Sequence, residues 1–434
     1  MLLLDHVHFQ YNGVMLGFLL GSIGFLIRGC PGDRRVISSQ NEDPSMFFGG
    51  IHNNLMAALL FAALLMLKHL YITLAPIYFF YLLRHYCYVF KSVARNQSSL
   101  SVQKDKQPTI TSSIQRFSLI RFAILGLITA SILILPLIPF LVFSDNPMQQ
   151  LLQMQKRLFP FNRGLTHDYW AGNIWAIHLF LVKVLSFVAK KLSFSPPILF
   201  ELSPKVVAVA LFLGLIPGMI CAWKCASKIS LKSEPILLST VTIERGNTIL
   251  YCIVFSGMSS FMLGYHVHEK AIMTALIPMS LLSLISKNNA RIFLRMLSIG
   301  NFGLLPLLYR PVELCFKIFI NIAFLGLSIF LLKSVHEENR IIYISQPKKG
   351  QIRAENKPLI TQLDILLLVI MSTILFFAEA VHPFFFKPHD LWEFLPLMLT
   401  SLYCALGLLG CWIQCGKAMF NSLQPFDGKC SLNE

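Results

Sequence analysis

Long apolar segments recur along nearly the whole chain, and short polar stretches separate them. A helix that crosses the hydrocarbon core of a bilayer needs about 20 mostly apolar residues, because a helix satisfies its own backbone hydrogen bonds in lipid. The segments close to this length are residues 13–28, 50–67, 70–90, 118–143, 206–223, 247–265, 271–286, 291–309, 313–333, 360–381 and 394–415. The pattern therefore predicts an all-α polytopic membrane protein with about eleven transmembrane helices.

A twelfth apolar segment, residues 171–189, has a different character. His178 and Lys183 interrupt an apolar run that also contains Trp175 and Phe180. Charged positions mixed with aromatic and aliphatic ones are typical of a helix that lies in the membrane interface. We therefore predict an interfacial helix here, and not a twelfth span.

The positions of Lys and Arg predict the orientation, because membrane proteins keep these residues in their cytosolic loops. If residues 171–189 do not cross, most of the 37 basic residues fall on one side of the membrane; if they cross, this asymmetry largely disappears. We expect one multi-span membrane domain over residues 1–434, with its N-terminus outside the cytosol. The polar stretches 91–117 and 334–359 are then flexible cytosolic loops. Residues 144–205 form a loop on the opposite side, which contains the interfacial helix.

Composition supports a membrane protein and excludes one class of partner. Hydrophobic residues make up 55% of the chain and charged residues 13%, against roughly 25% charged residues in soluble domains. The formal net charge of +16 would indicate a nucleic-acid partner in a soluble protein. Here the basic cytosolic loops account for it, so we expect no nucleic acid among the partners.

The first candidate site is the polar segment DHVHFQYNG, residues 5–13, directly ahead of the first span. A metal could be held by Asp5, His6 and His8, although residues two apart lie about 200° around a helix, so this pair chelates only on an extended backbone. A second interpretation is a hydrogen-bonding wall for a polyhydroxylated or phosphorylated substrate, with Gln10 and Tyr11 included. A third is an interfacial aromatic belt. The residues alone leave all three open.

The second candidate site is the basic and aromatic segment KRLFPFNRGLTHDYWAGNIW, residues 156–175. Arg163 is its candidate cation and Trp170 its candidate aromatic side chain. Arginine with interleaved aromatic rings suits a phosphate carried on a lipid, or a sugar face that stacks on an aromatic ring. An anchoring loop whose cations reach to the membrane surface is an equally good interpretation.

The third candidate site is the segment YHVHEK, residues 265–270, between two predicted spans. It lacks the HExxH spacing of a zinc protease. The connection must be tight, so its polar groups lie close to the membrane surface. His266, His268 and Lys270 are candidates for binding a phosphate. The alternative is that Glu269 and Lys270 simply neutralise each other.

Transfer of a sugar from a lipid phosphate needs two kinds of groups. Cations must stabilise the charge that grows on the leaving phosphate, and a carboxylate must take the proton from the acceptor hydroxyl. The clusters supply cations, but among the nearby carboxylates Asp5, Asp168 and Glu269 none is an obvious isolated base. A membrane transporter of lipids or solutes is the alternative. Transporters usually show inverted repeats and broken helices that meet at the bilayer midplane, whereas these clusters lie at span ends and no repeat is visible.

The three segments resemble motifs of one known family. DHVHFQYNG, RLFPFNRGL (157–165) and HVHEKAI (266–272) are similar to the motifs of the dolichyl-phosphate-glucose-dependent α-1,3-glucosyltransferases of asparagine-linked glycosylation, in the GT-C superfamily. The resemblance extends over nearly the whole chain, including KHLY (68–71) and LTSLYCA (399–405). Two sister enzymes of the family add the first and the second glucose, and the segment HDYWAGNIWA resembles the second-glucose enzyme more closely.

The resemblance implies a GT-C-like helical bundle in the endoplasmic reticulum membrane, multi-pass, with its active face luminal. It implies an inverting transfer of glucose from dolichyl phosphate β-glucose to a monoglucosylated high-mannose dolichyl diphosphate oligosaccharide, forming an α-1,3 linkage. The residues expected around the donor phosphate are His266, His268, Lys270 and Arg163. Those expected to line the substrate pocket are Asp5, His6, His8, Gln10, Tyr11, Glu269 and Trp170. No closed set of metal ligands is readable, and a divalent metal stays open.

The resemblance also predicts a difference from the family. Its members carry about three further spans and a large luminal loop ahead of the first motif, and that loop holds the catalytic acidic residue. We therefore expect these 434 residues to contain most of the donor and acceptor cradle and to lack the catalytic base.

Overall fold

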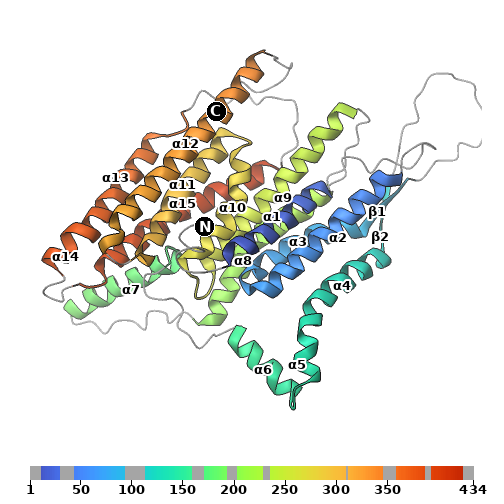
Figure 1. The fold of residues 1–434 in the computed structure, drawn as a ribbon, viewed down its shortest axis with the longest axis horizontal. Helices are drawn as coiled ribbons and strands as arrows, with labels where there is room; N and C mark the ends of the chain where they lie inside the picture. Colours follow the sequence, from blue (N-terminus) through green and yellow to red (C-terminus); the bar gives the residue numbers. More distant parts are fainter. Residues whose placement is uncertain are drawn as a thin grey trace, which may run out of the picture. The chain divides into compact units, whose positions relative to one another are not determined.

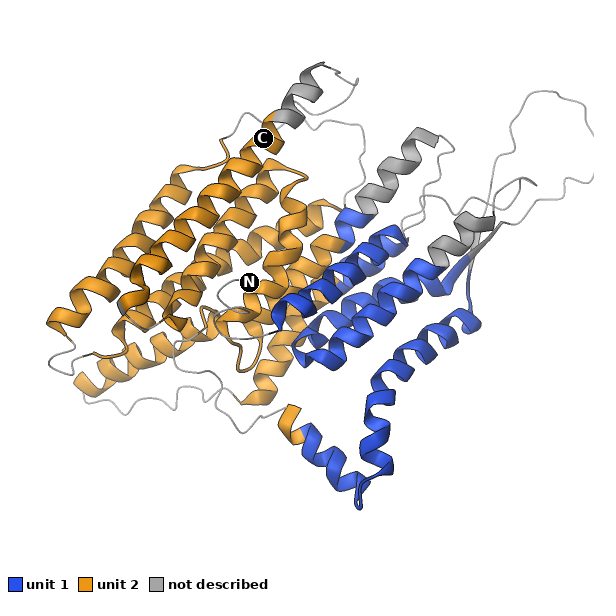
Figure 2. Ribbon diagram, viewed as in Figure 1, with its two compact units in different colours: residues 1–155, 219–249 blue, residues 156–218, 250–434 orange. Residues whose placement is uncertain are grey.

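The computed structural model describes residues 11–29, 44–92, 113–158, 171–192, 203–227, 235–308, 311–345, 358–386 and 392–423, and this part of the chain is almost entirely helical (Figure 1). The chain divides into two compact units, shown in blue and orange in Figure 2. Unit 1 comprises residues 1–155 and 219–249, and unit 2 comprises residues 156–218 and 250–434. The helices α6 (Pro147–Leu158), α8 (Pro204–Ser227) and α9 (Pro235–Leu263) are each divided between the two units.

Unit 1 is built around the packing of α1 on α2, with a small hydrogen-bonded core. Ser22 of α1 donates to the Ala57 carbonyl oxygen at 2.8 Å and lies 3.0 Å from the Tyr78 hydroxyl. The Tyr78 ring stacks on Phe61 with centroids 3.9 Å apart. The elements of this unit are α1 (Asn12–Arg28), α2 (Pro44–Leu67), η2 (His69–Leu74), α3 (Ala75–Leu82), η3 (Leu83–Cys87), β1 (Tyr88–Ser92), β2 (Ser113–Phe117), α4 (Leu119–Ile134), η4 (Leu135–Leu137) and α5 (Ile138–Val142).

Strands β1 and β2 correct the prediction of a flexible loop over residues 91–117. The two strands pair antiparallel, with Tyr88 opposite Phe117 and Ser92 opposite Ser113. Pairing of this kind depends on two segments meeting in space, so it leaves no signal in the local pattern of either segment. Residues 93–112 of the expected loop lie outside the described part of the chain.

Unit 2 is organised around α11, which packs against α10, α12, α13 and α15. Most of the α11 side chains are therefore buried, on every side of the helix. The elements of this unit are α7 (Ile174–Lys191), η5 (Glu269–Ile272), α10 (Met273–Ser283), α11 (Lys287–Leu304), η6 (Leu305–Leu307), η7 (Pro311–Glu313), α12 (Leu314–Ser345), α13 (Gln362–Phe376), η8 (Phe377–Val381), α14 (His382–Phe385) and α15 (Leu395–Asn421).

The apolar helices confirm an all-α multi-pass membrane protein. Within the described residues seven helices are long and apolar enough to cross a bilayer: Leu119–Val142, Pro204–Ser227, Gly246–Leu263, Lys287–Leu307, Leu314–Glu337, Gln362–Phe385 and Leu395–Asn421. Each falls on a segment that the sequence predicts as a span. Large apolar side chains such as Phe319 and Phe330 of α12 are exposed, as expected of side chains that face lipid, whereas Gly246–Leu263 and Lys287–Leu307 are mostly buried.

The other four predicted spans are shorter or broken. Two coincide with the apolar stretches Asn12–Arg28, which is the 17-residue helix α1, and His52–Leu67, the C-terminal part of the 24-residue helix α2. Predicted span 70–90 consists of η2, α3 and the π-helical η3, and predicted span 271–286 consists of the end of η5 followed by α10, which has 11 residues. Hydropathy averages over such changes of helix type, so the sequence alone shows them as continuous segments.

Helix α7 occupies the segment expected to lie in the interface. Its first turn is anchored, since Trp175 and Ala176 are buried, and the helix packs against α15. Lys183, Lys190 and Lys191 keep it outside the group of seven apolar helices. Its placement in the membrane interface stays a prediction. The preceding helix α6 is amphipathic, and the sequence analysis did not predict it.

Helix α12 corrects part of the second predicted cytosolic loop, residues 334–359. It continues to Ser345. Polar residues stabilise this extension, because Lys333 pairs with Glu337 one turn later and His336 lies 2.9 Å from the Ser283 carbonyl oxygen. Polarity shows that a segment leaves lipid, but it does not show that the helix ends there. Residues 346–357 lie outside the described part of the chain.

A buried ion pair links α12 to η8. The ammonium group of Lys317, whose side chain is 3% exposed, pairs with the Glu379 carboxylate, which is 25% exposed. Glu379 belongs to a π-helical segment. Such a segment is a local widening of the helix, and it is frequently found at functional sites. Charges within an apolar bundle are costly and need a partner. The local sequence pattern does not indicate this pair, because its residues lie 62 positions apart.

Candidate functional site

The structure describes five of the eleven predicted site residues. His266, His268, Glu269 and Lys270 lie in the connection between α9 and α10, and Tyr11 precedes α1 with 78% of its surface exposed. The predicted residues outside the described part of the chain are Asp5, His6, His8, Gln10, Arg163 and Trp170.

The connection between α9 and η5, residues 264–268, is a short turn with a constrained backbone. The Gly264 N–H donates to the Ser260 carbonyl oxygen at 2.9 Å, which closes the last helical turn. His266 follows with φ of 51°, in the left-handed region that residues other than glycine rarely adopt. Such conformations cost of the order of 1–3 kcal/mol and persist where the surroundings hold them in place. The Ala271 N–H then donates to the His268 carbonyl oxygen at 3.0 Å as η5 begins.

The side chains of this turn differ in exposure. His268 is exposed, His266 and Lys270 are half-buried, and Glu269 is buried with 6% of its surface accessible. The two imidazole rings meet edge to face, with centroids 5.7 Å apart. The turn therefore exposes the His268 imidazole on a constrained backbone, with the half-buried Lys270 two residues later, and imidazolium and ammonium groups stabilise a phosphate.

The end of the second predicted cluster packs directly on this turn. The Trp175 indole N–H donates to the Gly264 carbonyl oxygen at 3.0 Å, and the Trp175 side chain is buried. Asn173, fully buried, caps α7 by accepting a hydrogen bond from the Trp175 backbone N–H at 3.1 Å. The structure thus brings together two segments that lie 89 residues apart in sequence.

Gly172 fixes the same segment against α15. A Cβ atom at Gly172 would lie 2.3 Å from the Cys404 Cβ and 3.2 Å from the Ala405 backbone nitrogen, so only glycine fits without movement. Cys404 belongs to the segment LTSLYCA, one of the stretches that carry the family resemblance. Three stretches that carry the family resemblance therefore meet within unit 2: those around Trp175, Gly264 and Cys404.

Replacing Gly172 by alanine is expected to destabilise the protein by about 1–3 kcal/mol, the usual cost of overpacking a close contact. Thermal melting in mild detergent measures this effect. Removing the opposing Cβ with Cys404→Gly should reduce the effect of Gly172→Ala, and a double-mutant cycle isolates the coupling between the two positions. Gly410→Ala on α15, the helix that carries Cys404, is the control, because an added Cβ there would meet no neighbouring atom within 4 Å. Equal melting temperatures for the Gly172→Ala and unmodified proteins would contradict this packing.

In unit 1 the end of the first candidate segment, DHVHFQYNG, contacts KHLY, another stretch that carries the family resemblance. The Lys68 ammonium group donates to the Asn12 side-chain oxygen at 2.8 Å, and Asn12 is buried. The neighbouring His69 begins η2. Burial lowers the pKa of the His69 imidazole, and the positive charge of Lys68 lowers it further, so the neutral form is favoured. Asn12 is the last polar residue of DHVHFQYNG and Lys68 the first of KHLY.

Sequence reasoning missed several residues that build the site. Asn173, Trp175 and Gly172 position the second segment, and Lys68 holds Asn12. One of them carries a readable signal, since asparagine immediately before an apolar helix is a common N-cap. Among the residues that the structure describes, no group of three or more His, Cys, Asp or Glu side chains could hold a metal ion.

These features define a helical multi-pass membrane protein with a polar, cation-bearing turn at the ends of its helices. The family model described as the ALG6, ALG8 glycosyltransferase family matches residues 1–415. The chain belongs to this family.

Three relatives share the name Dolichyl pyrophosphate Glc1Man9GlcNAc2 alpha-1,3-glucosyltransferase. The chain is 32% identical to the Mus musculus protein, over 95% of this chain and 67% of the relative. It is 32% identical to the Bos taurus protein, over 95% and 68%, and 31% identical to the Gibberella zeae protein, over 95% and 70%. By this resemblance the chain is a glycosyltransferase.

Proposed function

We propose that this protein takes part in adding the second glucose to the lipid-linked oligosaccharide of asparagine-linked glycosylation. The donor is dolichyl phosphate β-glucose, and the acceptor is the monoglucosylated high-mannose dolichyl diphosphate oligosaccharide. The proposal places the reaction at the luminal face of the endoplasmic reticulum membrane. One support is the name of the relatives, which specifies a Glc1Man9GlcNAc2 acceptor for those proteins. The other is the hydrogen bond that joins Trp175 to Gly264, beside the turn HVHEK (residues 266–270), here called the HVHEK turn.

The proposed reaction is a single displacement that inverts the anomeric carbon. The bond between that carbon and the phosphate oxygen breaks, and dolichyl phosphate leaves with the electron pair. The acceptor hydroxyl oxygen forms the new α-1,3 bond, and its proton passes to a base. Stabilisation of the leaving phosphate is the task assigned to His268, Lys270 and His266, with Arg163 assisting. The exposure of His268 and the position of Lys270 two residues later in the same turn support this assignment.

In the family that the chain resembles, the base is an acidic residue of a luminal loop that precedes the first motif, and we assign the proton transfer to that residue. Glu269 is a poor candidate, because its carboxylate lies in the buried interior of the turn. The predicted pocket residues Asp5, His6, His8, Gln10, Tyr11 and Trp170 would then hold the sugars.

Donor binding and acceptor choice test the proposal separately. The chain in lipid nanodiscs should bind dolichyl phosphate glucose in preference to dolichyl phosphate mannose, and it should transfer little glucose by itself. Joined behind the N-terminal portion of the Mus musculus relative, here called the fused enzyme, it should glucosylate the monoglucosylated acceptor and leave the unglucosylated one unchanged. Preference for the unglucosylated acceptor would indicate the sister reaction that adds the first glucose. Absence of donor binding would refute the proposal.

A further inference from the structure

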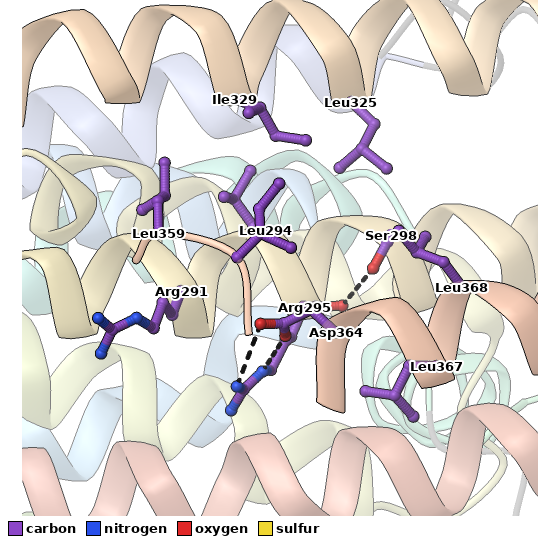
Figure 3. A pocket seen from close by; sticks show the side chains of 11 residues that line it. Arg291, Leu294, Arg295, Ser298, Leu325, Ile329, Leu359, Asp364, Leu367 and Leu368 are labelled. Atoms are coloured by element: carbon purple, nitrogen blue, oxygen red, sulfur yellow. Dashed lines mark hydrogen bonds and ion pairs between the residues drawn. The ribbon is translucent and has the colours of Figure 1, made fainter. Parts of the chain in front are cut away.

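A second polar cluster lies at the start of α11, at the end of unit 2 where α13 also begins (Figure 3). Arg295 is fully engaged there. Its guanidinium group donates to both oxygens of the Asp364 carboxylate, to the Gln414 side-chain oxygen at 3.0 Å and to the Thr361 hydroxyl at 3.2 Å. Asp364 in turn caps α13 together with Thr361. The single negative charge of this cluster is therefore already matched by Arg295.

Arg291, one helical turn earlier, forms no ion pair with a carboxylate in the part of the chain that the structure describes. Its residue surface is 7% exposed, and its Nε–H donates to the Pro358 carbonyl oxygen at 2.9 Å. The Nη2 atom is buried, and no hydrogen-bond partner reaches it from the part of the chain that the structure describes. A buried charge without a counter-ion is strongly unfavourable in an apolar environment. The geometry calls for an anion at this guanidinium group.

An apolar hollow adjoins Arg291. It lies between α11, α12 and α13, and only ≈ 30 Å³ of its space is cavity volume, the remainder being open to the surroundings. The wall is mainly aliphatic and includes Leu294, Leu325, Ile329 and Leu368. Figure 3 shows the Arg291 guanidinium directed away from Leu294 and Leu368, toward the N-terminal end of α11. The cation thus lies at the helix end, and the aliphatic surface continues from it into the apolar part of the bundle.

We propose that Arg291 and this hollow bind one anionic phospholipid, with the phosphate at the guanidinium group and an acyl chain along the aliphatic wall. Arginine binds phosphate through several parallel hydrogen bonds. The charge distribution predicts that this end of α11 faces the cytosol, where the leaflet carries anionic lipids. The aliphatic wall favours a lipid over a free phosphate ion. This site is separate from the glucosyl-transfer site and does not depend on the proposed function.

Three variants of the 434-residue protein test the site. Arg291→Gln removes the charge, and Ile329→Trp fills the hollow and leaves Arg291 in place. Lys287→Gln is the matched control, because it removes the same charge one turn earlier on α11 from a half-exposed position. Each protein is purified in mild detergent, and native mass spectrometry measures binding of phosphatidylserine and of phosphatidylcholine.

The unmodified protein should bind phosphatidylserine preferentially. Arg291→Gln should weaken this binding about tenfold or more, as expected for the loss of charge-assisted hydrogen bonds. Ile329→Trp should weaken it as well, and Lys287→Gln should change it less than twofold. Excess inorganic phosphate should not displace the lipid. Phosphatidylserine binding that is equal in the Arg291→Gln and unmodified proteins would overturn the proposal, and so would displacement by phosphate.

A carboxylate close to Pro358 in sequence is an alternative counter-ion for Arg291, and the test must distinguish it from a lipid phosphate. Glu355 precedes Pro358, the backbone partner of Arg291, by three residues. If the lipid is the counter-ion, Glu355→Gln should leave phosphatidylserine binding and melting temperature unchanged. Matching losses of melting temperature in Glu355→Gln and Arg291→Gln, without any bound lipid in the unmodified protein, would assign the counter-ion to Glu355 and overturn the lipid site.

Discussion

Replacing His268 by alanine in the fused enzyme is expected to lower glucose transfer by roughly 100-fold or more. Removal of one preorganised group that stabilises developing charge typically costs about 10²–10³ in turnover. His268 is the exposed imidazole of the turn, and the hydrogen bond from Trp175 to Gly264 holds the turn in place. The loss should appear in kcat for the monoglucosylated acceptor, measured with saturating dolichyl phosphate glucose.

The control for this prediction is His52→Ala, since His52 is an exposed histidine of α2 in unit 1. It should leave turnover within twofold of the unmodified fused enzyme. Thermal melting of both variants distinguishes a chemical effect from a folding defect, because an exposed side chain contributes little to stability. A His268→Ala enzyme with unchanged kcat and an unchanged melting temperature would remove His268 from the site.

Replacing Lys317 by methionine is expected to destabilise the protein by about 3 kcal/mol. The substitution leaves the Glu379 carboxylate without its partner in a largely apolar bundle, and breaking a buried ion pair typically costs about 3–5 kcal/mol. Glu379 is one quarter exposed, which places the expected effect at the lower end of that range. The melting temperature in mild detergent and the yield of folded protein measure the loss.

Two further variants make this prediction specific. Lys317→Met combined with Glu379→Gln removes both charges and should recover most of the lost stability. Lys333→Met on the same helix disrupts the pair with Glu337, in which both side chains are largely exposed, and should cost less than about 0.5 kcal/mol. If Lys317→Met and Lys333→Met lowered the melting temperature equally, the Lys317–Glu379 pair would not be the stabilising element described.

The sequence predicts the long spans well because lipid imposes a requirement that each segment must meet by itself. Continuous apolar helices such as Leu119–Val142 and Gln362–Phe385 satisfy their backbone groups within the segment, so hydropathy identifies them. The same reasoning places the HVHEK turn correctly between α9 and α10. It also separates α7 from the spans, because His178 and Lys183 interrupt the apolar run.

Features that depend on contacts between distant segments could not be predicted in this way. The Trp175–Gly264 hydrogen bond and the Lys317–Glu379 pair join residues 89 and 62 positions apart. The pairing of β1 with β2 and the extension of α12 are likewise stabilised by partners that a local pattern does not contain. Motif resemblance located the HVHEK turn, and the structure adds that Trp175 bonds the second segment to Gly264 beside this turn, while Gly172 packs the segment on α15.

Side-specific labelling of introduced cysteines tests most directly whether the polar motifs share one luminal face. Asp5→Cys and His268→Cys are introduced separately into a protein whose own reactive cysteines are replaced, and sealed microsomes are treated with a membrane-impermeant maleimide before and after permeabilisation. If both motifs face the lumen, both positions should react only after permeabilisation. Reaction of one position in sealed vesicles and of the other only in opened ones would place the two motifs on opposite sides of the membrane, and a common sugar-transfer site would then be impossible.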